Sequence, residues 1–171
     1  MRRADEDEYR QFVGARLDHL RRTAYLLCRD WHTADDLVSI TLGKLYRAWP
    51  RVRAAENVDA YVRRVLTRVW LDERRRPWRR ERSTDEVPDG AAPDSEPDLA
   101  DRELLLELLG KLPERRRAVV VLRFYCDLSV EDTAQILGVT TGTVKSQAAR
   151  ALESLRLLAV DQPALRTGGF A

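Results

Sequence analysis

Residues 129–150, SVEDTAQILGVTTGTVKSQAAR, decide the fold of the C-terminal half of the chain. Ser129 is a favourable N-cap, and Asp132 three residues later gives a start that is similar to a capping box. Gly138 follows a short apolar-faced helix at the point where a positive φ is often needed, and glycine adopts it without steric cost. Val139 fills the corner, and one of the two threonines after it caps a second helix. The spacing therefore predicts two helices that cross at a tight turn.

The second of these helices has an apolar side and a polar side. Spacings of three and four residues predict an inward face of Val144, Ala148, Ala151, Leu152 and Leu155. The outer set is Thr141, Thr143, Lys145, Ser146, Gln147 and Arg150. Such side chains can donate to phosphates and base edges, since Lys and Arg suit guanine and Gln suits adenine. With the small Ala134, the glycine and the apolar corner residue, the pattern indicates a helix-turn-helix rather than an ordinary antiparallel helix pair.

Charge is strongly segregated along the 171 residues, although the net charge is only +2. Residues 63–82 hold nine arginines against three acids, a local charge of +6, whereas residues 83–103 hold eight acids against one arginine, a local charge of −7. This asymmetry favours a nucleic-acid surface beside an acidic tether. The length is enough for one ordinary domain or two small ones.

Periodic apolar residues predict helices throughout, and no alternating strand pattern competes with them. The predicted fold class is all-α, with two small helical bundles joined by a flexible acidic linker. The expected domains are residues 5–80, a linker at 81–98, a helix-turn-helix domain at 99–159 and a frayed tail at 160–171. In the first domain, helices are expected over 5–29, from Thr33 until Pro50 stops it, and from an Asn57 cap to about Arg76, with a loop from Pro50 to Glu56. In the second, Pro113 opens a helix whose Val119, Val120, Leu122 and Phe124 support the helix-turn-helix.

The helix after Asn57 carries arginines and aromatic rings together. Its expected exposed side is Arg63, Arg64, Arg68, Arg74 and Arg75, with Trp70 and Trp78 among them and Trp49 and Tyr61 nearby. Rings beside cations can stack unpaired bases, which suggests a single-strand site. The alternative interpretation is that most of these rings complete the helical core.

Enzymatic, metal and membrane functions find no support in the residues. No phosphate-binding glycine loop occurs, and only His19 and His32 are available for a catalytic triad, so we expect neither an enzyme nor a cofactor. His19 and Cys28 are nine residues apart, about 900° around a continuous helix, so they cannot share a zinc ion with His32. Without an apolar run of membrane-spanning length or a signal peptide, the protein is expected to be cytoplasmic, with Cys28 and Cys126 as reduced core residues.

Two blocks of sequence carry a family resemblance that spans roughly residues 8–158. Residues 112–156, LPERRRAVVVLRFYCDLSVEDTAQILGVTTGTVKSQAARALESLR, resemble the promoter-upstream-reading domain of bacterial sigma factors of the extracytoplasmic-function group. Residues 33–49, TADDLVSITLGKLYRAW, and 57–76, NVDAYVRRVLTRVWLDERRR, resemble the other domain of that group. The resemblance implies a subunit that joins core RNA polymerase, at the clamp of the largest subunit and the flap of the second, and directs it to promoter DNA. An anti-sigma factor is a common further partner in the group.

The resemblance also implies three sets of contact residues. The residues that it implies for docking on core polymerase are Asp35, Asp36, Leu37, Ser39 and Ile40. The minus-ten element would be bound as an opened strand with a flipped base. The residues implied for this contact are Arg53, Asn57, Tyr61, Arg63, Arg64, Arg68, Trp70, Arg74 and Arg75. The minus-thirty-five element would be read as duplex in the major groove. The residues implied for this contact are Thr140, Thr141, Thr143, Lys145, Ser146, Gln147, Ala149 and Arg150.

Three positions depart from the family pattern. Ser39 and Ile40 stand where a Gln and an acid are usual, Arg68 where an Asn is common, and Gln147 where an Arg is common. Promoter preference therefore does not carry over from the family. Two other functions compete on the residues: a stand-alone helix-turn-helix regulator whose N-terminal bundle dimerises or senses, and an adaptor whose basic helix binds an acidic protein.

Overall fold

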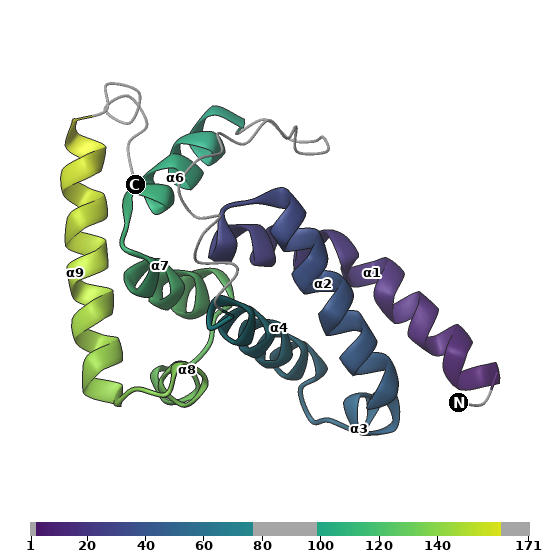
Figure 1. Cartoon of the computed structure of the whole chain (residues 1–171). Helices are drawn as coiled ribbons and strands as arrows, with labels where there is room; N and C mark the ends of the chain where they lie inside the picture. The colour runs from purple at the N-terminus through teal and green to yellow at the C-terminus, as the bar shows by residue number, and fades with distance from the viewer. Residues whose placement is uncertain (1–2, 77–98, 162–171) are drawn as a thin grey trace. The chain divides into compact units, whose positions relative to one another are not determined.

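The computed structural model describes residues 3–76 and 99–161, which belong to two compact helical units (Figure 1). The first unit contains α1 (Arg3–Cys28), α2 (Trp31–Arg47), α3 (Trp49–Arg53) and α4 (Val58–Arg74). The second contains α6 (Leu99–Lys111), α7 (Glu114–Val120), the π-helical turn η1 (Val121–Tyr125), α8 (Val130–Leu137) and α9 (Thr141–Val160). The predicted all-α class with two helical domains is confirmed. The predicted linker at 81–98, Trp78 and all but the first two residues of the predicted tail lie outside the described residues.

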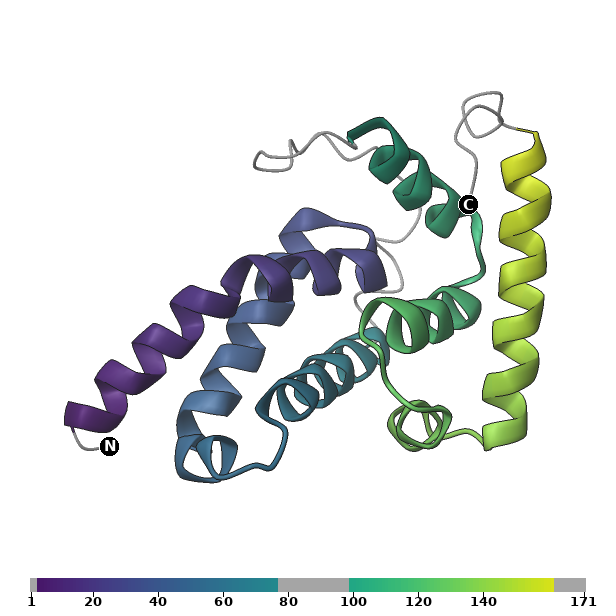
Figure 2. The same ribbon diagram turned by 180° about the vertical axis from the view of Figure 1, so that it is seen from behind.

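The core of the first unit lies between α1, α2 and α4, which pack against one another (Figures 1 and 2). Each of these helices has an apolar stripe, and Leu27, Leu37 and Leu66 from the three stripes are fully buried. The Tyr9 ring meets Trp49 edge-on with centroids 5.1 Å apart, and its hydroxyl donates to the Leu42 carbonyl at 2.7 Å. These contacts attach the start of α1 to the end of α2 and to α3.

Helix ends in the first unit agree only partly with the predictions. Asn57 caps α4 as expected, because its side chain accepts a hydrogen bond from the Ala60 N–H at 2.9 Å. The expected start of the second helix at Thr33 is wrong, since Asp30 is the cap and accepts from the Thr33 N–H at 2.8 Å. The loop expected from Pro50 begins with the short helix α3 instead. Proline is compatible with the first turn of a helix, where its missing N–H would have no partner.

The second unit is built on the predicted helix-turn-helix, in which α8 packs beside the N-terminal end of α9 (Figures 1 and 2). Ser129 caps α8 by accepting from the Asp132 N–H at 2.9 Å, and Thr140 caps α9 by accepting from the Thr143 N–H at 3.1 Å. Gly138 has a φ of 68°, the left-handed conformation that its position predicts. Val119, Ala134 and Val144 form the small core between α7, α8 and α9, with Val139 packed against it.

Two expected core positions of this unit are exposed. Phe124 is 53 % exposed and lies within a π-helical turn, in which the Cys126 N–H donates to the Val121 carbonyl at 2.9 Å. Leu152 is 46 % exposed, since it lies one step of about 100° from the fully buried Ala151. The apolar stripe of α9 is therefore narrower than its composition suggests.

None of the helices in residues 3–76 and 99–161 combines the length and the apolar character that a membrane crossing needs.

A pair of buried threonines generates a stability prediction. Thr133 and Thr41 are both 0 % exposed, but the Thr41 hydroxyl donates to the Leu37 carbonyl at 2.7 Å, whereas the Thr133 hydroxyl has no hydrogen-bond partner. Thr133→Val should therefore stabilise the second unit by about 1 kcal/mol, because it removes an unsatisfied buried hydroxyl. Thr41→Val should destabilise the first unit by a similar amount. Chemical unfolding of both variants measures this, and destabilisation by Thr133→Val would show that its hydroxyl is satisfied in solution.

Candidate nucleic-acid and protein interfaces

The exposed side of α9 carries the first candidate surface. Thr141, Lys145, Ala149 and Arg150 are exposed, whereas Val144 and Ala151 of the same helix are fully buried. Neither Lys145 nor Arg150 has a carboxylate partner within residues 3–76 and 99–161. The two charges are therefore available to phosphates or to the acceptor edges of guanine.

The hydroxyl groups of the same surface have structural roles. Thr140 and Thr143 hydroxyls are 2.9 Å apart, and the Ser146 hydroxyl donates to the Thr143 carbonyl at 3.1 Å. These bonds order the first turn of α9, whose remaining backbone N–H groups favour an anion. Gln147 is only half-exposed, and its Oε1 atom is buried without a donor. A Gln side chain that reads adenine would have to turn outward from this position.

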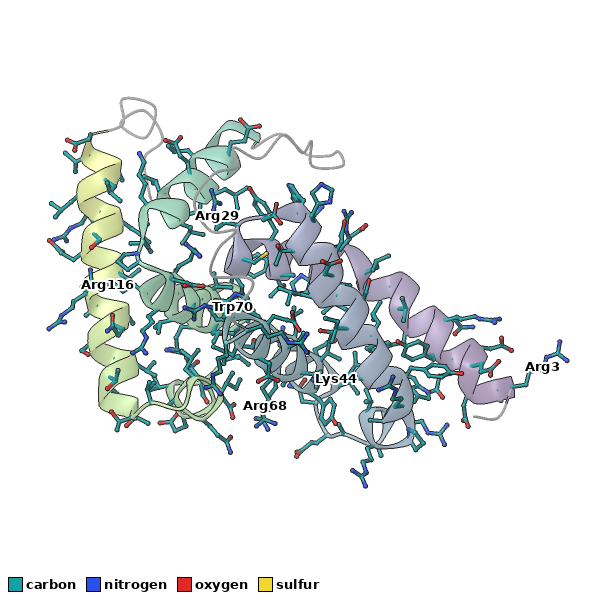
Figure 3. All side chains as sticks on the ribbon, in the orientation of Figure 1. Arg3, Arg29, Lys44, Arg68, Trp70 and Arg116 are labelled. Carbon is teal, nitrogen blue, oxygen red and sulfur yellow. The ribbon has the colours of Figure 1, made fainter. Side chains whose placement is uncertain are left out.

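The arginines of α4 lie on two different sides of the helix. At about 100° per residue, Arg64, Arg68 and Arg75 share a stripe with Tyr61, opposite the buried Leu66 and Trp70. We call these four residues the α4 stripe. Arg68 is exposed and extends away from α4 in Figure 3. The stripe combines three cations with an aromatic ring, which is a suitable surface for an unpaired strand.

Trp70 is a correction to the expected minus-ten set. It is only 2 % exposed, and the Arg74 guanidinium lies 5.0 Å from its ring centre. Trp49 is equally buried. For both rings the interpretation as helical core is the right one, so neither offers a face on which a base could stack. Arg74 is turned toward Trp70 and away from the α4 stripe.

Arg63 faces α1 rather than the α4 stripe. It lines a cavity of about 410 Å³ with His19 and Asp59. Burial and the Arg63 guanidinium lower the pKa of His19, whereas Asp59 acts in the opposite direction. Asp59 in turn accepts from the Arg16 Nε at 2.6 Å, and the Arg16 guanidinium lies 4.6 Å from the centre of the Phe12 ring. Arg63 therefore belongs to the packing between α1 and α4.

Two further residues of the minus-ten set already have partners. Asn57 uses its side-chain oxygen to cap α4. Arg53 forms ion pairs with two carboxylates of α1, at 2.6 Å from Asp5 Oδ1 and 3.3 Å from Glu8 Oε2. A strand that contacts Arg53 must compete with these acids.

The expected docking stretch lies at the start of α2. Asp35, Asp36, Ser39 and Ile40 are exposed, and Ile40 is an apolar side chain on an otherwise polar surface. Leu37 is a correction, because it is fully buried in the core and cannot contact a partner. Arg21 of α1 donates two hydrogen bonds to Asp35, at 2.6 and 3.2 Å, and the hydrogen bond to this carboxylate raises the pKa of Arg21. Asp35 therefore also fixes α1 against α2.

Sequence reasoning did not identify Arg16 and Arg21 as participants in these surfaces. Their partners Asp59 and Asp35 lie on other helices, 43 and 14 residues away. Such spacings carry no local pattern, unlike the i,i+4 pairs that a helix brings together. Within the described parts of the chain, no three His, Cys, Asp or Glu residues lie close enough to hold a metal ion.

Comparisons with known proteins match both units. Residues 12–80 match the family model for sigma-70 region 2, and residues 102–155 match the one for sigma-70 region 4. The chain is 39 % identical over 154 residues to the RNA polymerase sigma-E factor of Streptomyces coelicolor, covering 87 % of this chain and 84 % of that protein. It is 35 % identical over 146 residues to the sigma factor SigL of Mycobacterium tuberculosis, covering 81 % of each.

Two solved structures are also similar. The sigma factor RpoE of Bartonella quintana, in complex with the anti-sigma factor NepR, has a TM-score of 0.69 and 27 % identity, covering 91 % of this chain and 99 % of that one. CnrH in complex with the cytosolic domain of CnrY has a TM-score of 0.60 and 21 % identity, covering 92 % of this chain and 91 % of that one. The second likeness is one of fold.

The unpaired cations of α9 generate a binding prediction. Lys145→Ala and Arg150→Ala should each weaken binding to duplex DNA that holds the recognised sequence. A lost phosphate contact should lower the salt slope by about one, and a lost base contact should cost about 1–3 kcal/mol and relax one position. Titrations at several salt concentrations measure both effects.

Arg156→Ala is the matched control on the same helix. It removes the same charge, but Arg156 pairs with Glu153 at 2.9 Å. Equal losses in all three variants would mean that net charge, rather than this surface, binds the DNA.

Proposed function

The chain belongs to the extracytoplasmic-function group of sigma-70 family RNA polymerase sigma factors, and from this premise we propose how its helices divide the work of promoter recognition. It is a non-catalytic subunit that directs RNA polymerase to promoters through regions 2 and 4. We assign the minus-thirty-five element to α9 and the opened minus-ten strand to the α4 stripe. Core polymerase docks on the exposed side of α2. Because polymerase and chromosome share the bacterial cytoplasm, the protein acts there.

The main support for this assignment is that each of the two units has its own basic surface, and that the two surfaces differ in kind. On α9, Lys145 and Arg150 project from a continuous helix of 20 residues that a tight turn holds against α8. A helix of this kind can enter the major groove of closed duplex, where each base pair has a distinct pattern of donors and acceptors. On α4, three arginines and a tyrosine share one stripe of the helix, which suits a backbone and bases that are already unpaired.

The energies of the two tasks differ, which supports their separation. Reading a duplex needs only rigid placement of donors, and each bidentate base contact contributes about 1–3 kcal/mol. Extruding a base costs a few kcal/mol that stacking and hydrogen bonds must offset. The α4 stripe can contribute to that offset through Tyr61 and its arginines only after opening has begun. Upstream binding should therefore precede strand capture.

An anti-sigma factor is a second proposed partner. Its support is the likeness to the sigma factor of Bartonella quintana, which was solved with the anti-sigma factor NepR. A protein of that class that binds this chain should block its association with core polymerase. Measuring core binding with and without a candidate inhibitor tests the proposal, and simultaneous binding of both would contradict it.

The two competing functions have less support. A stand-alone regulator does not need a first unit that matches sigma-70 region 2, and the match covers residues 12–80. An acidic-protein adaptor does not need the groove-facing polar side of α9. If promoter-specific transcription requires this protein together with core polymerase, the sigma-factor function is favoured over both alternatives.

Docking generates a prediction with a closely matched control. Ile40 on α2 and Leu17 on α1 are both apolar and both 37 % exposed. Ile40→Asp should weaken association with core polymerase at least about tenfold, because a charge would replace an apolar contact at the interface. Leu17→Asp should bind as the unsubstituted protein does, and neither variant should change the thermal midpoint by more than a few degrees. Fluorescence anisotropy with core polymerase measures the affinities, and equal losses would contradict docking on α2.

Strand opening generates a second prediction. Holoenzyme reconstituted with core polymerase should produce permanganate-reactive thymines near the transcription start of a linear promoter template, and neither component alone should do so. Substituting Arg64 and Arg68 by alanine should reduce this reactivity about tenfold or more, with less effect on upstream binding, because both residues lie on the α4 stripe.

The double substitution of Arg63 and Arg74 removes the same charge from the other side of α4. It should leave opening closer to that of the unsubstituted holoenzyme, provided that the thermal midpoint is maintained. Opening lost equally in both double variants would contradict the assignment of the stripe. Tight sequence-specific duplex binding by the isolated chain, with transcription independent of it, would contradict the sigma-factor mechanism as a whole.

A further inference from the structure

Arg53 is held by two acids from a distant part of the chain. Its Nη1 atom lies 2.6 Å from Asp5 Oδ1 and 3.3 Å from Glu8 Oε2, and 48 and 45 residues separate these partners. The contact joins the first two turns of α1 to the end of α3, just before the loop that leads to α4. One guanidinium nitrogen therefore donates to two carboxylates, and the same group can donate to the oxygens of a phosphate.

The surroundings of the contact leave the arginine accessible. The Asp5 side chain is 18 % exposed, but the Arg53 side chain is 44 % exposed. Arg53 and Glu8 also line a cavity of about 360 Å³ between α1, α3 and the start of α4, with Phe12 and Trp49. A new anion can thus approach the guanidinium from the open side, and the side chain has space to turn.

The two acids have other stabilisation when Arg53 leaves. Asp5 lies in the first turn of α1, where the positive end of the helix dipole favours a negative charge, and Glu8 lies one turn later. Partly exposed carboxylates are also solvated by water, and ion pairs of this kind contribute little net stability. The contact is formed in the structure, and a partly exposed ion pair of this kind can be exchanged for another anion at little cost.

We propose that Asp5 and Glu8 take the place of a promoter phosphate on Arg53 and keep this residue from DNA until the opened strand displaces them. The proposal rests on the minus-ten role that the family resemblance implies for Arg53, which lies on α3 and not on the α4 stripe. The acids make an autoinhibitory contact, because they reduce the affinity of the free first unit for any polyanion. In the holoenzyme, the upstream element and the polymerase hold the opened strand nearby, and the high effective concentration of its phosphates shifts the exchange toward DNA.

The experiment compares two double variants with the same change of charge. Asp5→Asn with Glu8→Gln removes both partners of Arg53. Glu6→Gln with Asp7→Asn neutralises the two intervening acids, neither of which contacts Arg53, since Asp7 pairs locally with Arg10 at 3.6 Å. Holoenzymes made from the full chain and core polymerase are titrated with promoter DNA that carries a preformed bubble at the minus-ten region.

The Asp5/Glu8 variant should bind this DNA about two- to fivefold more tightly than the Glu6/Asp7 variant, a range that corresponds to the loss of a competing exposed ion pair. Adding Arg53→Ala to both variants should abolish the difference. Equal affinities of the two double variants, or a difference that persists without Arg53, would overturn the proposal.

Two further variants distinguish a failure of the autoinhibitory contact from a failure of the minus-ten role of Arg53. Arg53→Ala alone should weaken bubble binding, and if it does while the double variants remain equal, the minus-ten role stands and the autoinhibitory contact does not. Glu8→Gln alone removes only the longer contact and should give a smaller gain. It serves as the test if the double variant has a lowered thermal midpoint, since Asp5 then still attaches α1 to α3.

Discussion

The left-handed turn at Gly138 fixes the angle between α8 and α9, and the exposed surface of α9 depends on that angle. A residue with a side chain would be strained at a φ of 68°, although no neighbouring atom lies within 4 Å of the position that a Cβ would occupy. The constraint is therefore one of backbone conformation rather than of space. Because Ala134 and Val144 meet directly across the turn, the polar side of α9 faces outward without the need for a large core.

The helices of both units could be predicted because apolar periodicity and capping chemistry are local. Asn57, Ser129 and Gly138 each act on residues within one turn, so their effects can be deduced from the sequence. The failures occurred where a choice between neighbours depends on tertiary packing. Asp30 and Thr33 are both capable caps, and the structure uses the earlier one. The π-helical turn before Cys126, which contains the exposed Phe124, has no local signal of comparable strength.

The candidate surfaces were also predictable to different degrees, because some depend on one helix and others on packing between helices. On α9, the buried stripe and the polar side follow from one helix, so Lys145 and Arg150 could be recognised directly. On α4, the arginines look equivalent as a group, and only the burial of Leu66 and Trp70 divides them into an outer stripe and a set turned toward other helices. Leu37 and Trp70 have residue types that suit an interface, but the core needs large apolar side chains at their positions.

Charge pairing across helices divides the cations of this chain into those that already have a carboxylate partner and those that we propose are available to DNA. The chain has 30 basic and 28 acidic residues, so its affinity for a polyanion depends less on net charge than on which cations already have a carboxylate. Arg16, Arg21 and Arg53 of the first unit are paired with acids from other helices. Lys145 and Arg150 have no such partner in the described part of the chain. On the assignment that we propose, the duplex-reading surface of α9 is ready in the free protein, whereas Arg53 must first exchange Asp5 and Glu8 for phosphates. In the mechanism that we propose, upstream contact comes before downstream capture because the two units differ in their ion pairs, and no signal between the units is needed.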